Sequence, residues 1–161
     1  MATKKTRNII AKPRGREIIV TQILDAPRED VFKAQIDPAL IPQWWGPKIY
    51  ATTVEKMETR PGGLWRIVQR GPDGKEHVFK GVYHLVAPPE RIVRTFEYEG
   101  VPGHVLLETA TLEEKDGKTK LTRTSIFETV EDRDGMIQSG MEEGVTESMN
   151  RLEELLRSLR H

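Results

Sequence analysis

The sequence predicts an α+β domain in which a curved antiparallel sheet of seven strands wraps around a long C-terminal helix, with two short helices after the first strand. Two observations predict it. Runs of β-branched and aromatic residues are separated by short turns rich in Gly, Pro and Asp, and one stretch near the C-terminus carries apolar residues at helical spacing. A chain of 161 residues is long enough for one domain with a substantial core and too short for two ordinary ones.

The composition excludes several classes of protein. Lys and Arg number 25 and Asp and Glu number 25, so a zero net charge offers no attraction to nucleic acid or to an anionic membrane. The absence of Cys excludes disulfides, thiolate catalysis and thiolate metal sites. No segment approaches the roughly 18 consecutive apolar residues of a membrane span, and the basic N-terminus lacks the apolar stretch of a secretory signal. We therefore expect a soluble, cytoplasmic protein without membrane insertion.

The first part of the chain predicts a tail, a strand and two short helices. Residues 1–15 are expected to form a basic, disordered tail, and residues 16–161 a single domain. The β-branched run over residues 18–24 predicts the first strand. Pro27 suits the first turn of a helix, where its missing N–H costs nothing. A short helix is expected there, and a second over residues 38 to about 44.

Six further strands are expected after these helices. They are the runs at residues 49–57, 64–69, 77–86, 91–98, 105–113 and 119–127. The turns between them supply Gly, Pro or Asp where the backbone must reverse, as in Gly71-Pro72-Asp73-Gly74. The connections are too short for crossover helices, so neighbouring strands are expected to pair antiparallel.

The end of the chain predicts one long helix. Thr129 is placed to cap it, and it could run for about 28 residues, or roughly 40 Å. The residues that recur at spacings of three or four, and so form one helical face, are Ile137, Met141, Val145, Met149, Leu152, Leu156 and Leu159.

The first half of this helix is expected to border a groove. Interior glycine costs a helix about 1 kcal/mol relative to alanine, so Gly140 and Gly144, in line with Ser148, need a reason. The glycines either admit a backbone segment at close approach or leave volume that a ligand fills. Methionine beside them fills irregular space without fixing its shape. The helix residues expected to line a ligand site are Met136, Gly140, Met141, Gly144, Val145 and Met149.

Aromatic residues elsewhere would complete such a site. The motif Trp44-Trp45-Gly46-Pro47 follows a short helix, where a large side chain can gate an opening, although a tryptophan pair is more commonly a core corner. Concave pockets lined by apolar and aromatic groups are the usual form of a small-molecule site. The aromatic candidates for the lining are Trp44, Trp45, Trp65, Phe79, Tyr83 and Phe96.

Candidates for catalysis are few. No pair of His has the helical spacing of a zinc site and no Cys could complete one, so neither a metal nor a cofactor is expected. Glu108 is the candidate acid or base, because burial in a cavity would raise its pKa. The alternation of an antiparallel sheet favours an outward orientation for it instead. Arg66, Arg94 and Arg123 could anchor a carboxylate ligand if they point inward.

Several motifs resemble a known superfamily. They are Asp25-Ala26-Pro27-Arg28-Glu29-Asp30-Val31-Phe32, Trp44-Trp45-Gly46-Pro47, Arg60-Pro61-Gly62-Gly63, Pro88-Pro89-Glu90-Arg91-Ile92-Val93 and Ser139-Gly140-Met141-Glu142-Glu143-Gly144. Over residues 16–159 the chain is similar to the AHSA1-like branch, named for the C-terminal domain of the activator of Hsp90 ATPase, of the START/Bet v 1-like (SRPBCC) superfamily. The resemblance implies a helix-grip fold. Members of the superfamily bind lipids, hormones, polyketides or partner proteins, and some catalyse cyclisation.

Three functions stay open. The first is binding of a small apolar or amphipathic ligand in a cavity between the sheet and the C-terminal helix. The second is a protein-interaction module of the Hsp90 co-chaperone kind, which predicts a large exposed apolar patch instead of an enclosed void; only a short tail precedes the first strand, so it is expected less. The third is a cyclase- or hydrolase-type enzyme with an inward carboxylate. A nucleic-acid partner is not expected.

Overall fold

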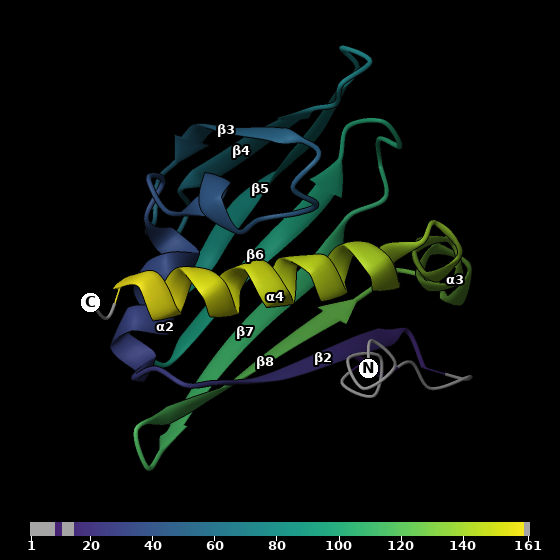
Figure 1. The fold of residues 1–161 in the computed structure, drawn as a ribbon. Helices are drawn as coiled ribbons and strands as arrows, with labels where there is room; N and C mark the ends of the chain where they lie inside the picture. Colours follow the sequence, from purple (N-terminus) through teal and green to yellow (C-terminus); the bar gives the residue numbers. More distant parts are fainter. Residues whose placement is uncertain (1–8, 11–14, 160–161) are drawn as a thin grey trace.

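The structure, a computed structural model, describes residues 9–10 and 15–159. Seven antiparallel strands form one curved sheet that holds a C-terminal helix, which confirms the predicted α+β helix-grip architecture (Figure 1). The strands lie in the order β2-β8-β7-β6-β5-β4-β3. Their bounds are β2 Glu17–Leu24, β3 Ala51–Met57, β4 Leu64–Arg70, β5 Glu76–Ala87, β6 Arg91–Tyr98, β7 Leu106–Lys115 and β8 Lys118–Ile126.

A short strand, β1 (Ile9–Ile10), extends the sheet at its β2 edge. It pairs antiparallel with β2, with Ile9 opposite Val20. It falls in the segment for which the sequence predicts a disordered tail. The rest of that prediction concerns residues outside the described ranges, apart from residue 15.

Two short helices follow β2, as predicted. They are α2 (Arg28–Ile36) and the 3-10 helix η1 (Ile41–Gln43). Pro27 precedes the first turn of α2, where Glu29 and Asp30 favour the positive end of the helix dipole. These helices close one end of the sheet, because Val31 and Phe32 of α2 are buried in the main core cluster.

The C-terminal region forms two helices, so the prediction of one continuous helix is wrong. The first is α3 (Val130–Gln138), capped by Thr129, whose side chain accepts a hydrogen bond of 3.0 Å from the Asp132 N–H. The second is α4 (Met141–Leu159). Between them Gly140 has a φ of +86°, a left-handed conformation that ends helices and that glycine adopts without steric cost. Figure 1 shows α3 beside the start of α4 and turned away from its axis.

The inner face of the sheet packs against α4 unevenly along the helix. At the C-terminal half, Leu152, Leu155 and Leu156 belong to a large core cluster with the buried residues of β4 and β5. At the N-terminal half, Met149 packs with a smaller cluster from β2, β7 and Phe127, the residue after β8. One end of the sheet–helix interface is therefore solid, and the other holds fewer buried side chains.

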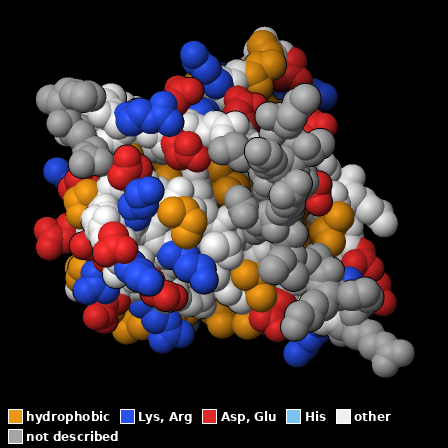
Figure 2. Space-filling view, turned by 60° about the horizontal axis from the view of Figure 1, so that its bottom comes forward, with side chains coloured by type: hydrophobic (Ala, Val, Ile, Leu, Met, Phe, Trp, Pro, Cys, Tyr) orange, Lys and Arg blue, Asp and Glu red, His pale blue; other side chains and the backbone are white. Residues whose placement is uncertain are grey.

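Charged side chains of both signs share the outer surface. On the face in Figure 2, Lys and Arg alternate with Asp and Glu, and apolar side chains stand singly or in small groups between them. In the described part of the chain, no helix is both long and apolar enough to cross a membrane.

Candidate functional site

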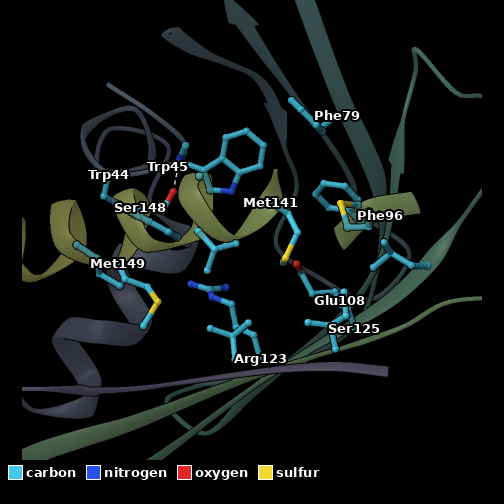
Figure 3. Close-up of a pocket in the computed structure, with 18 of the residues that line it drawn as sticks. Trp44, Trp45, Phe79, Phe96, Glu108, Arg123, Ser125, Met141, Ser148 and Met149 are labelled. Carbon is cyan, nitrogen blue, oxygen red and sulfur yellow. Dashed lines mark hydrogen bonds between the residues drawn. The ribbon is translucent and has the colours of Figure 1, made fainter. Parts of the chain in front are cut away.

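A cavity of about 300 Å³ lies between the sheet and the N-terminal half of α4 (Figure 3). Strands β2, β6, β7 and β8 supply its floor, and α3, α4, one side chain each from β4 and β5, and the segment 44–47, here called the tryptophan loop, supply the other walls. The lining is mostly apolar. Its volume is at the lower end of the range of about 300–1,000 Å³ that small-molecule sites occupy.

Most of the residues that the sequence singles out meet at this cavity. Trp65 and Tyr83 do not line it; each is 1% exposed and packed in the core. Gly140 does not line it either, because it lies in the turn between α3 and α4. The predicted residues that line the cavity are Trp44, Trp45, Phe79, Phe96, Met136, Met141, Gly144, Val145 and Met149.

The sequence predicts that Gly140, Gly144 and Ser148 form a groove along one helix. This prediction is wrong, because Gly140 lies between α3 and α4. The two explanations for the small residues were volume left for a ligand and close approach of backbone. Each applies at one position. A Cβ added at Gly144 would have Pro47 Cγ at 3.9 Å as its nearest neighbour, an ordinary contact that leaves space beyond it. At Ser148 backbone does approach closely, since its Oγ accepts a hydrogen bond of 2.7 Å from the Gly46 N–H.

The tryptophan loop is fastened to α4. Arg151 donates from Nη1 to the Gly46 carbonyl at 2.6 Å and from Nη2 to the Pro42 carbonyl at 3.2 Å. Gly46 has a φ of +76°, a left-handed conformation that glycine adopts without steric cost. Gln69 also fastens the loop, because its Nε2 donates a hydrogen bond of 3.3 Å to the Trp45 carbonyl. The roles of Arg151 and Gln69 were not found from the sequence, in which only the glycine after two tryptophans signals a tight turn.

The two tryptophans differ in role. Trp44 is buried, and its indole N–H donates a hydrogen bond of 2.9 Å to the Ala34 carbonyl, so it is largely a core residue. Trp45 is half-buried and meets Phe79 edge to face, with ring centroids 5.1 Å apart. Phe96 continues this aromatic wall, at 5.6 Å from Phe79.

A charged cluster lies on the floor of the cavity. Glu108 points inward and accepts a hydrogen bond of 2.7 Å from Nε of Arg94, so the outward orientation that the sequence favours is wrong. Arg94 and Arg123 also line the cavity, whereas Arg66 does not and pairs with Glu99. Figure 3 shows Glu108 and Arg123 extending from the sheet toward α4.

The pKa values of this cluster do not suit acid or base catalysis. Burial disfavours the charged form of Glu108, but attraction to Arg94 and Arg123 outweighs it and the pKa of Glu108 is lowered. The raised pKa expected for an inward Glu108 is therefore wrong, and an ionised carboxylate of low pKa is a weak general base. Burial lowers the pKa of Arg123 to about 10. The positive charge of Arg94 lowers this pKa further, and the negative charge of Glu108 raises it. Arg123 is therefore protonated at neutral pH.

A metal site has no basis in the described residues, among which no group of three or more His, Asp or Glu is placed to hold an ion.

The polar neighbours of the charged cluster are neutral. Gln22 donates a hydrogen bond of 2.8 Å to the Met149 carbonyl, and Ser125 lies opposite Glu108 in the β7–β8 pairing. The chemistry available at this floor is therefore ion pairing and hydrogen bonding.

Solved structures with this fold come from several bacteria. A protein from Rhodobacter sphaeroides is 28% identical, with a TM-score of 0.86 over 95% of this chain and 99% of its own. A protein from Arthrobacter aurescens is 25% identical, with a TM-score of 0.86 over 93% and 91% of the two chains. One from Mycobacterium smegmatis, at 23% identity, has a TM-score of 0.83 over 92% and 94%.

A search of curated protein sequences found no match. The sequence model of the activator of Hsp90 ATPase homolog 1-like family matches residues 25–157, which include strands β3 to β8, the tryptophan loop and most of α4. The match extends over much more than half of the 161 residues. The chain therefore belongs to the activator of Hsp90 ATPase homolog 1-like family.

Proposed function

We propose that this protein binds a small apolar or amphipathic molecule in the cavity between the sheet and α4. The observation that supports it most is the cavity itself, about 300 Å³ in volume and lined mainly by apolar side chains. A concave cavity of this size, with apolar walls and a few polar groups on one side, has the form of a ligand site.

The two alternatives have less support. An interaction module would present a broad apolar patch. The large exposed apolar residues of the described part are Ile23, Ile49, Leu64, Val101, Leu107, Ile126 and Leu159. Among them the strand pairing places Leu107 beside Ile126, and it pairs none of the others with one another. A cyclase or hydrolase would need an acid or base of suitable pKa, and Arg94 and Arg123 keep Glu108 ionised.

Filling the cavity from α4 tests the proposal. Gly144→Leu adds a side chain beside Pro47 at the cavity wall and replaces an interior helical glycine, which favours the helix by about 1 kcal/mol. We expect the variant to fold and to bind ligands about 10–100-fold more weakly, as for overpacking that costs 1–3 kcal/mol. The probes are phenylbutyrate and its neutral amide, phenylbutanamide, titrated by tryptophan fluorescence because Trp45 lines the cavity.

The matched control is Gly135→Leu. Gly135 lies in α3, outside the cavity, and a Cβ there would meet nothing within 4 Å. It should bind both probes as the wild type does. If neither probe changes the fluorescence of the wild type, or if both leucine variants bind equally well, the proposal is wrong.

A further inference from the structure

We infer that the ligand of this cavity is an amphipathic monocarboxylate, whose head group pairs with Arg123 while its apolar body lies among the aromatic and methionine side chains. The inference rests on the proposed function and adds the chemical class of the ligand. It depends on the balance of charge at the cavity floor, on the free donors of Arg123 and on the shape of the apolar walls.

The charges that line the cavity do not cancel. Of the described residues in its lining, those that are charged are Arg94, Glu108 and Arg123. Arg94 and Glu108 form an ion pair of 2.7 Å between side chains that are 11% and 17% exposed. One positive charge, on Arg123, is left over. Because charges interact strongly where water is scarce, this surplus favours the entry of a single anion.

Arg123 has hydrogen-bond donors available for that anion. A guanidinium carries five N–H donors in a planar fork that matches the two oxygens of a carboxylate. Among the residues that the structure describes, Arg123 donates one hydrogen bond, to Oε1 of Gln35, and makes no ion pair. The Trp44 ring lies 5.3 Å from its guanidinium carbon. Most of its N–H donors therefore have no partner among the described residues, on a side chain that lines the cavity.

The remaining walls suit an apolar body. Trp45, Phe79 and Phe96 form an aromatic surface with successive ring centroids 5.1 and 5.6 Å apart. Met141 extends from the start of α4 toward Glu108 (Figure 3), and methionine adapts its shape to the molecule that it contacts. A volume of about 300 Å³ limits the body to an aryl group or an alkyl chain of moderate length.

A structural role explains Arg123 less well. A buried cation without its own counter-ion lowers the stability of a fold, and Arg123 is in this position because Arg94 is the closer partner of Glu108. Perturbed ionisable groups that face a cavity are typical of functional sites. The lowered pKa of Arg123 agrees with this explanation.

The test compares phenylbutyrate with phenylbutanamide by isothermal titration calorimetry at about neutral pH, where the acid is ionised. The two probes have similar shapes and differ in charge. We expect the wild type to bind phenylbutyrate about 10–100-fold more tightly, because a hydrogen-bonded buried charge contributes that much. Arg123→Met should bring the ratio of the two affinities close to one. Glu108→Gln should widen the ratio, since it removes the only negative charge among the described lining residues.

Arg66→Met is the matched control. Arg66 is also a strand arginine, but it pairs with Glu99 outside the cavity and its replacement should leave the ratio unchanged. Equal affinities in the wild type, or a preference for the acid that survives in Arg123→Met, would overturn the inference and leave the proposed function standing. Failure of both probes to bind would overturn both, because the amide reports on the cavity without the charge. Thermal unfolding shows whether each variant is folded. If Arg123→Met does not fold, the ratio measured for Glu108→Gln still decides the test.

Discussion

Trp44→Ala is expected to lower the free energy of unfolding by about 3–5 kcal/mol, the usual cost of truncating a buried tryptophan. The ring of Trp44 is buried within the main core cluster, and its indole N–H is paired with the Ala34 carbonyl. Each 1 kcal/mol shifts the midpoint of thermal unfolding by about 2–4 °C in a domain of this size. A thermal melt followed by circular dichroism should therefore show a midpoint about 10 °C lower.

Trp45→Ala provides the comparison. Its ring is half-buried, contacts Phe79 and faces the cavity, so its removal deletes wall surface and leaves the core in place. We expect a loss of about 1 kcal/mol in stability, the contribution of an edge-to-face aromatic pair, and a weakening of phenylbutyrate binding by at least about tenfold. Equal losses of stability in the two variants would show that the tryptophan loop is a single core element and not part of a binding wall.

Replacement of each arginine of the charged cluster is expected to change the free energy of unfolding differently. Arg94→Met removes one partner of a buried ion pair and the contact of its guanidinium with the Trp65 ring, at 3.9 Å. Breaking such a pair costs about 3–5 kcal/mol because it leaves a charge buried. The attraction of Arg123 for Glu108 places the expected loss at the lower end of that range.

Arg123→Met removes the surplus cation and leaves the Arg94–Glu108 pair intact. We expect its free energy of unfolding to be unchanged or raised by up to about 2 kcal/mol, since apolar groups commonly replace buried charges without loss. The loss of the hydrogen bond to Gln35 limits the gain. Urea denaturation of both variants measures the difference. A loss for Arg123→Met as large as that for Arg94→Met would contradict the account of Arg123 as a binding residue.

Much of the fold could be predicted because the residues that end its strands are recognisable from the local sequence. The turns supply Gly, Pro or Asp at each reversal, and β6 begins and ends at Arg91 and Tyr98 as predicted. The break at Gly140 was missed because the apolar spacing of Ile137, Met141 and Val145 continues across it. The sequence around Gly140 fits both an interior glycine and the left-handed glycine that commonly ends a helix, and the structure has the second.

The cavity could be predicted in part, and its floor could not. Bulky aromatic and methionine residues identify themselves by type, whereas the direction of a strand side chain depends on parity alone. In β7 the adjacent Leu106 and Leu107 are both apolar, so hydrophobicity does not reveal which face is inward, and Leu106 is buried while Leu107 is 37% exposed. The inward position of Glu108 follows from that parity. Its partners Arg94 and Arg123 come from two other strands, a juxtaposition that only the sheet pairing creates.

The most direct test of the cavity as the binding site uses the methyl groups of methionine. Met136, Met141 and Met149 line the cavity, whereas Met57, on β3, does not. Nuclear magnetic resonance of protein with isotope-labelled methionine methyl groups, titrated with phenylbutyrate, should show saturable shifts at the three cavity methionines, little change at Met57, and loss of these shifts in Gly144→Leu. Shifts of equal size at Met57, or no shift at the three cavity methionines, would contradict the account.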